Sequence, residues 1–165
     1  MGARKGLFRK YPNPIFIETG SLTGHGILQA LGEGFTKIYS IEIVHDWFVH
    51  CSNKFQNVPG VHLLYGDSAI MLEGLMKIID VPCTFWLDAH MGTEKTPLLQ
   101  ELEIIKNHHI KTHTILIDDL RDWKIEVNGV NPAMLKAKLR EINPKYKFVY
   151  EWGFQPNDIL VAVAR

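Results

Sequence analysis

The stretch Phe16-Ile17-Glu18-Thr19-Gly20-Ser21-Leu22-Thr23-Gly24-His25-Gly26 decides the fold. An apolar run ends in an acid, and three glycines then lead into a segment with helical spacing. Glycine permits positive φ and close approach of a second backbone, and a helix N-terminus offers free N–H groups to a carboxylate or phosphate. The pattern ExGxxxGxG therefore indicates a ligand-binding turn between a strand and a helix. A turn that needs glycine for packing alone is the alternative.

Outward from this turn, the chain alternates between short apolar runs and segments of helical spacing. The predicted strands are Ile15–Glu18, Lys37–Glu42, Val61–Tyr65, Thr84–Leu87, Thr114–Ile117, Phe148–Trp152 and Ile159–Ala164. Five helical stripes separate the first six strands, which predicts a parallel sheet with helices on both faces. The last two strands are joined by GFQPND, which is too short for a crossover helix. We therefore expect an α/β, Rossmann-like, doubly wound seven-stranded sheet in which the last strand is antiparallel.

The composition is that of one globular domain. The chain has 165 residues, of which 46% are hydrophobic, and 18 basic residues balance 18 acidic ones. We expect a single domain over residues 1–165, with residues 1–13 as a tail whose basic side chains are solvated or cover the mouth of a site. Because the charges balance, the sequence shows no excess of basic residues that would indicate nucleic-acid binding. No apolar run is long enough to span a bilayer. Cys51 and Cys83 form no metal or redox motif, so a reducing, cytoplasmic location is expected.

Further acids end the second and third predicted strands. Glu42 ends the second strand, where an acid can accept both hydroxyls of a ribose. The third strand is followed by Gly66-Asp67-Ser68. Asp67 has two readings, because it can accept from an adenine amino group or, like Ser68, cap the next helix. Ligands of open α/β sheets bind along the carboxyl edge, which favours a ligand site for the acids taken together.

A second group of acids ends the fourth and fifth predicted strands. Asp88 follows Phe85–Leu87, and Asp118 and Asp119 follow Ile115–Ile117. Neighbouring strand ends bring these three carboxylates together, and they repel unless a proton or a cation lies between them. Oxygen-only ligands suit Mg²⁺, Ca²⁺ or Mn²⁺. The alternative is a metal-free edge, with Asp88 and Asp118 beside the cofactor and Asp119 capping a loop.

The glycine turn, Glu42 and the Gly-Asp pair resemble the motifs of class I S-adenosylmethionine-dependent methyltransferases, and the final hairpin matches the end of that fold. The resemblance covers nearly the whole chain and implies S-adenosylmethionine as cofactor. It implies that the turn packs against the methionine part of the cofactor, that Glu42 holds the ribose and that Asp67 lies near the adenine. The residues assigned to the cofactor are Glu18, Gly20, Gly24, Gly26, Glu42, Asp67, Ser68 and Asp88.

The second group of acids is similar to that of one metal-dependent branch, the macrocin and novobiocin-type sugar O-methyltransferases. That branch binds Mg²⁺ through the aspartates at these three strand-end positions, which here are Asp88, Asp118 and Asp119. Its general base is an acid two residues after the first of them, where this chain has His90. We assign His90 and Asp88 as the catalytic residues, since a histidine can accept the same proton. A histidine that only binds a loop is the alternative.

The remaining expectations concern partners and competing functions. The acceptor is expected to be a small molecule or a sugar hydroxyl, with Trp123, Trp152 and Phe154 as a candidate wall, and a homo-oligomer is possible. His108, His109 and His113 precede the fifth strand and are expected to be solvated. The competing functions are a metal-dependent hydrolase and a non-catalytic binder of adenosylmethionine or a nucleotide. A nicotinamide oxidoreductase is disfavoured because the glycine spacing is not GxGxxG.

Overall fold

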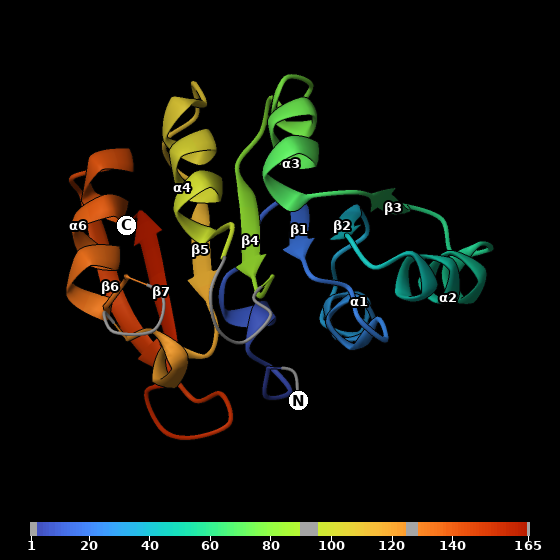
Figure 1. Ribbon diagram of the computed structural model, residues 1–165, viewed down its shortest axis with the longest axis horizontal. Helices are drawn as coiled ribbons and strands as arrows, with labels where there is room; N and C mark the ends of the chain where they lie inside the picture. Colours follow the sequence, from blue (N-terminus) through green and yellow to red (C-terminus); the bar gives the residue numbers. More distant parts are fainter. Residues whose placement is uncertain (1–2, 90–95, 125–128, 165) are drawn as a thin grey trace.

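Seven strands form one mixed sheet in the computed structural model, which describes residues 3–89, 96–124 and 129–164 (Figure 1). The strand order is β3-β2-β1-β4-β5-β7-β6. The strands are β1 (Ile15–Thr19), β2 (Ile38–Glu42), β3 (Val61–Tyr65), β4 (Cys83–Leu87), β5 (Thr114–Ile117), β6 (Tyr146–Glu151) and β7 (Ile159–Ala164). The predicted fold class is confirmed, and three of the seven strands have the predicted bounds.

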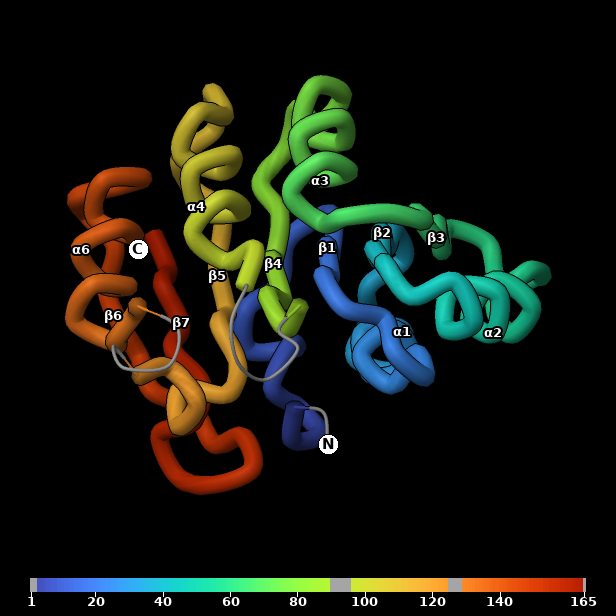
Figure 2. Tube along the Cα trace, viewed as in Figure 1, coloured from blue at the N-terminus to red at the C-terminus, as the bar shows by residue number. Residues whose placement is uncertain are grey.

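The direction of the last strand is also confirmed. The first five strands pair in parallel, whereas β7 is antiparallel to both of its neighbours, β5 and β6. The seven residues 152–158 reverse the chain between β6 and β7 without a helix. Because β7 runs antiparallel to β5, the link that reverses the chain comes to the same edge of the sheet as the carboxyl end of β5 (Figure 1 and Figure 2).

Helices cover both faces of the sheet. One core cluster unites residues of the sheet with the apolar stripes of α3 (Ser68–Met76), α4 (Leu98–Asn107) and α6 (Pro132–Ile142). The opposite face packs against α1 (His25–Gly32) and α2 (His45–Phe55). Strand residues alternate between the two clusters, as a pleated strand requires: Ile17 belongs to the first and Phe16 to the second. None of the helices in the described ranges is long and apolar enough to cross a membrane.

The N-terminal segment packs onto the second face instead of forming a tail. It contains the short 3₁₀ helix η1 (Phe8–Lys10), and the side chains of Leu7, Phe8 and Tyr11 are buried. The Phe8 ring centroid lies 4.7 Å from that of Phe16 and 5.2 Å from that of Trp86. Expecting a tail here is wrong, although the basic side chains of the segment are exposed as expected. The apolar residues between those basic ones complete the core of this face.

Two histidines at the amino edge of the sheet are buried, which corrects the expectation that they are solvated. His108 follows α4 and His113 precedes β5, and their facing ring nitrogens lie 2.9 Å apart. The backbone N–H of Cys83 donates to His113 Nδ1, so the other nitrogen of that neutral ring carries the hydrogen directed at His108. Burial lowers the pKa of His113 to about 3. His109 is exposed, as expected.

Candidate functional site at the carboxyl edge of the sheet

The glycine turn after β1 is held tightly against its neighbours. Gly20 has a φ of +86°, and a Cβ added to it would lie 2.9 Å from the carbonyl oxygen of Asp88. Gly24 has a φ of +75° at the start of α1, and a Cβ there would lie 2.6 Å from the ring of Phe55. A side chain at either position is excluded both by the backbone conformation and by the neighbouring atoms. The turn therefore brings bare backbone between the carboxyl ends of β2 and β4.

Glu18 lies beneath this turn as a buried carboxyl group. Its Oε2 accepts a hydrogen bond of 2.5 Å from Ser40 Oγ of β2. A Cβ on Gly26 would lie 1.7 Å from Glu18 Oε1, so the carboxyl group fills the space that this glycine leaves. Burial raises the pKa of Glu18 to about 8, and the charges of Asp88 and Glu42 add to the rise. Glu18 thus supports the turn from within the protein.

Glu42 connects the glycine turn to the loop after β2. Its Oε2 accepts from the backbone N–H of Leu22 and its Oε1 from that of Val44, both at 2.8 Å. The side chain is almost fully buried. Each oxygen of an ionised carboxylate has a second lone pair, so both can accept one further hydrogen bond. Glu42 is therefore fixed in position while it keeps acceptor capacity.

The structure gives Asp67 and Ser68 roles within the protein. Asp67 is the N-cap of α3, and its Oδ1 accepts from the backbone N–H of Ala69 at 2.8 Å. Ser68 is buried, and its hydroxyl donates a bond of 2.6 Å to Glu101 Oε1. Sequence reasoning missed Glu101, a buried acid in the first turn of α4. The signal for it was an acid one residue before Leu102, within the apolar stripe of that helix.

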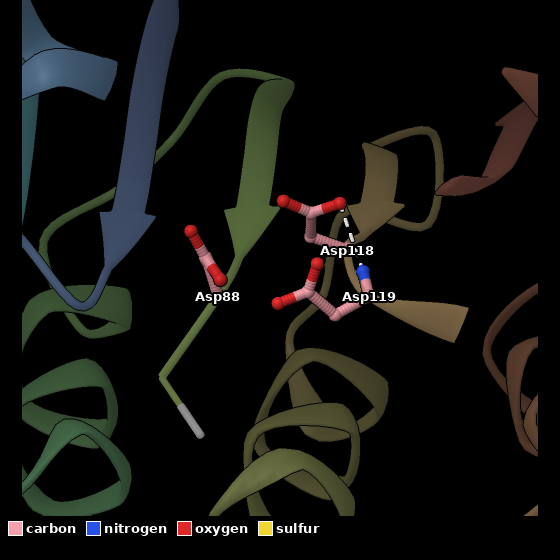
Figure 3. A group of neighbouring side chains, drawn as sticks. All are labelled: Asp88, Asp118 and Asp119. Atoms are coloured by element: carbon pink, nitrogen blue, oxygen red, sulfur yellow. Dashed lines mark hydrogen bonds between the residues drawn. The ribbon is translucent and has the colours of Figure 1, made fainter. Parts of the chain in front are cut away.

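The second group of acids converges as the sequence predicts. Figure 3 shows the carboxylates of Asp88, Asp118 and Asp119 turned toward one another from the ends of β4 and β5. One oxygen from each lies within 4.8 Å of the other two. We call these three residues the acidic cluster. Asp88 and Asp119 are partly buried, whereas Asp118 is fully buried.

The electrostatics of the acidic cluster follow from its burial. Burial, reinforced by the charges of Asp88 and Asp119, raises the pKa of Asp118 to about 8, although the backbone N–H of Asp119 donates to it at 2.8 Å. Asp119 has a φ of +56°, the left-handed region in which a non-glycine residue is uncommon. Its carboxylate is therefore aimed at the cluster by an unfavourable backbone conformation, which the surrounding contacts must hold in place.

Two residues that sequence reasoning missed hold this conformation. The guanidinium Nη1 of Arg121 lies 2.5 Å from Asp119 Oδ1 and also pairs with Asp158 Oδ2. Asp158 directly precedes β7 and has no exposed surface. Its carboxylate also accepts from the backbone N–H groups of Arg121 and Phe154. The sequence offers one hint, an arginine two residues after the Asp-Asp pair, but nothing that connects it to a residue 37 positions away.

The aromatic residues near the cluster divide into two kinds. Trp123 is buried, and its indole N–H donates to the carbonyl oxygen of Asp118 at 2.9 Å, so it packs and positions instead of forming a wall. Trp152 and Phe154 are 47% and 65% exposed, and flank Gly153. A Cβ on Gly153 would lie 3.1 Å from Asp118 Oδ1, so the backbone between the two rings passes beside the acidic cluster. The Phe154 ring centroid lies 5.1 Å from the guanidinium of Arg121, whereas the Trp152 ring centroid lies 3.9 Å from that of Arg4, on the N-terminal segment. His90, the predicted base, lies outside the described residues.

Comparison with known proteins identifies the fold. No family profile and no curated protein sequence matches the chain. An O-methyltransferase from Bacillus cereus, in complex with S-adenosylhomocysteine, matches with a TM-score of 0.66 at 13% identity, over 96% of this chain and 77% of that chain. TomG from Streptomyces achromogenes is an O-methyltransferase of tomaymycin synthesis in complex with S-adenosylmethionine. It matches with a TM-score of 0.64 at 11% identity, over 96% of this chain and 76% of that chain.

A third match extends the comparison to a sugar-modifying enzyme. CalS10 from Micromonospora echinaspora, an amino pentose methyltransferase of calicheamicin biosynthesis with S-adenosylmethionine bound, matches with a TM-score of 0.60 at 10% identity, over 96% of this chain and 86% of that chain. All three structures match this chain at low sequence identity, so the likeness is one of fold alone. The chain therefore has the fold of the class I S-adenosylmethionine-dependent methyltransferases.

Proposed function

We propose that the protein is an S-adenosylmethionine-dependent methyltransferase that methylates a hydroxyl group of a small molecule or sugar. The observation that carries the proposal is the glycine turn, whose bare backbone lies between Glu42 and Asp88 with Glu18 beneath it. A turn that needed glycine for packing alone would not require a carboxylate on each side of it, at Glu42 and at Asp88. The three methyltransferases described above bind S-adenosylmethionine or S-adenosylhomocysteine in the same fold.

In this proposal the cofactor lies along β1, β2 and β3. Glu42 accepts the two ribose hydroxyls with the lone pairs that Leu22 and Val44 leave, and the methionine part lies against the backbone of the glycine turn. Asp67 contributes a carboxylate near the adenine while Oδ1 caps α3. Ser68 contributes its backbone at most, since its hydroxyl is used by Glu101.

The acidic cluster suits a hard divalent cation such as Mg²⁺. Its ligands are all carboxylate oxygens, the preferred donors of that ion, and they are near enough to share one. Asp88, Asp118 and Asp119 would hold the ion, which would lower the pKa of an acceptor hydroxyl. Without a cation the buried Asp118 stays protonated near neutral pH, as its pKa of about 8 indicates. The fit therefore rests on donor chemistry and on charge.

The chain's own residues then position the acceptor and remove its proton. The methyl group of S-adenosylmethionine is already electrophilic, so the protein mainly aligns two reactants. His90, which follows Asp88 by two positions in the sequence, is proposed to accept the hydroxyl proton. Phe154 offers an exposed ring near Arg121 and the cluster for an acceptor to pack against. Cys51 and Cys83 are free and buried, which agrees with a cytoplasmic location.

Calorimetry with S-adenosylhomocysteine, ATP and NAD tests the cofactor assignment. We expect binding of the homocysteine compound and none of NAD. Glu42→Ala should weaken that binding about 10- to 100-fold, since hydrogen bonds to a charged group contribute about 1.5–3 kcal/mol and the turn also loses an acceptor. Asp80→Asn is the control, because Asp80 is an exposed acid just before β4, at the opposite edge of the sheet. NAD binding without a response to S-adenosylhomocysteine would refute the assignment.

Turnover separates an enzyme from a passive binder. Formation of S-adenosylhomocysteine from S-adenosylmethionine should depend on an acceptor bearing a hydroxyl group, and should fall when a chelator removes divalent ions. Binding without turnover across sugars and phenols would favour the non-catalytic binder. Metal-dependent hydrolysis without S-adenosylhomocysteine binding would favour the hydrolase.

A further inference from the structure

We infer that Arg121 is a built-in counter-ion of the acidic cluster, which competes with a divalent cation for Asp119 and so sets how tightly the site takes metal. The inference rests on the metal site of the proposed function and concerns a residue that is not one of its ligands. Its basis is that the guanidinium already neutralises one of the three clustered carboxylates.

The contacts of the guanidinium show a cation shared between two acids. Nη1 lies 2.5 Å from Asp119 Oδ1 and also pairs with Asp158 Oδ2. This nitrogen carries two hydrogens, so both are used, one toward each carboxylate. The second terminal nitrogen lies 3.7 Å from Asp122, whose side chain is 52% exposed. The two close contacts of Arg121 are thus with one carboxylate inside the acidic cluster, Asp119, and one outside it, Asp158, while Asp122 is a more distant third partner.

The two partners hold Arg121 unequally. Asp158 is fully buried and receives the backbone N–H of Arg121 in addition to the guanidinium, whereas the Asp119 side chain is 18% exposed. A buried carboxylate that loses its cation costs far more than an exposed one. When a second cation arrives at the cluster, the contact with Asp119 is therefore the one that gives way, and Arg121 stays with Asp158.

The competition is a matter of charge and distance. A divalent ion bound by Asp119 would lie beside a guanidinium on the same carboxylate, and like charges so close repel strongly in a partly buried site. Binding must therefore displace Nη1 from Asp119. Because this displacement costs free energy, it lowers the affinity for metal. In the metal-free protein, Arg121 neutralises the charge of Asp119. The guanidinium also lies 5.1 Å from the ring centroid of Phe154, so its movement changes the surroundings of an exposed ring beside the site.

Mn²⁺ binding tests the inference without any turnover. Free Mn²⁺ is measured by electron paramagnetic resonance in titrations of the wild type, Arg121→Gln and Arg121→Lys at pH 8. Glutamine keeps a donor for Asp158 but removes the charge, so R121Q should bind Mn²⁺ about 10-fold more tightly. Lysine keeps the charge, so R121K should stay near the wild-type affinity. Unchanged or weaker binding by R121Q would overturn the inference.

Asp158→Asn tests the same competition from the other side and covers a failure of R121Q to fold. Without the buried charge of Asp158, Arg121 pairs more strongly with Asp119 and competes better with the metal. D158N should therefore bind Mn²⁺ at least about 3-fold more weakly than the wild type. Equal or tighter binding by D158N would contradict the inference. If neither the wild type nor R121Q binds Mn²⁺, the inference falls together with the metal site, while binding of S-adenosylhomocysteine still decides the methyltransferase assignment separately.

Discussion

The carboxyl edge of the sheet has two halves that treat their acids differently. In the half formed by β1, β2 and β3, the carboxyl groups of Glu18, Glu42 and Asp67 accept from a serine hydroxyl or from backbone N–H groups. In the half formed by β4, β5 and β7, the acids face one another, and an arginine holds two of them. Hydrogen bonds from neutral donors organise the first half, whereas in the second half a proton on Asp118 and the guanidinium of Arg121 offset the repulsion between carboxylates.

In the proposed function the first half binds a neutral ribose and adenine and the second binds a metal, and this contrast is the reason for that division. A carboxylate that backbone donors hold in place keeps a defined direction, and direction is what a hydrogen-bonded ligand requires. Carboxylates that lie close together repel one another until one of them is protonated or a cation binds between them. The predictions below change one half at a time, beginning with the largest expected effect.

Gly26→Ala should damage the first half most. The added Cβ would meet Glu18 Oε1 at 1.7 Å and force the buried carboxyl group out of place. We expect S-adenosylhomocysteine binding to fall by more than about 100-fold and stability to fall by about 1–3 kcal/mol, the usual cost of overpacking. Calorimetry and urea denaturation provide the measurements. Mn²⁺ affinity should change little, because the acidic cluster lies in the other half.

Gly74→Ala is the matched control for that substitution. Gly74 lies within α3, and a Cβ there would meet no atom within 4 Å. Alanine should stabilise the helix by about 0.5–1 kcal/mol and leave ligand binding unchanged. A loss of binding in this variant equal to that of G26A would show that the effect is general and not a property of the turn.

The second half should respond to pH. The pKa of Asp118 is raised to about 8, above its value in the unfolded chain, so its contribution to stability is lost as pH rises from about 4 through 8. Asp118→Asn does not titrate. In the absence of metal this variant should therefore be more stable than the wild type at pH 9, by about 1–2 kcal/mol.

Thermal unfolding from pH 5 to pH 9 measures this difference. Mg²⁺ should restore the stability of the wild type at high pH, because it binds the ionised carboxylates, and should not affect D118N. Part of the slope should remain in the variant, since the pKa of Glu18 is raised to about 8 as well. If the stability of D118N fell with rising pH as steeply as that of the wild type, ionisation of Asp118 would not be the cause of the pH dependence.

The smallest effect separates the two readings of Asp67. Asparagine caps a helix about as well as aspartate, whereas alanine costs about 1 kcal/mol. Asp67→Asn should therefore keep the wild-type stability and Asp67→Ala should lose it, as urea denaturation will measure. If the carboxylate also meets the adenine, D67N should bind S-adenosylhomocysteine a few-fold more weakly. Unchanged affinity in D67N would leave Asp67 as a cap alone.

The sequence correctly predicts those strands and helices that are determined by residues near one another in the chain. The bounds of β3, β5 and β7 match the predicted ranges because apolar runs between turn residues define them. The convergence of the acidic cluster is predictable too, because parallel strands end at one edge. The contact of Arg121 with Asp158 is not, since it joins residues 37 positions apart and depends on where β7 lies.

Two other features were mistaken for the same reason. His108 and His113 are expected from the sequence to be solvated, yet their rings form a hydrogen bond with each other within the core. No local sequence pattern predicts this pairing. Phe8 lies among basic residues, and its burial depends on the part of the sheet face that needs covering. Pairings that are distant in sequence, and not individual propensities, decide both cases.

The place of β7 in the sheet has a consequence for the order in which the molecule is made. Of the seven strands β7 is translated last, yet it inserts between two strands translated earlier, β5 and β6. During translation, the glycine turn and Glu42 are made before most of the domain. The ion pair between Arg121 and Asp158 can form only after the last strand has been made. A nascent chain can thus assemble the half that holds the glycine turn early, and its acidic half only when the final strand has been inserted between β5 and β6.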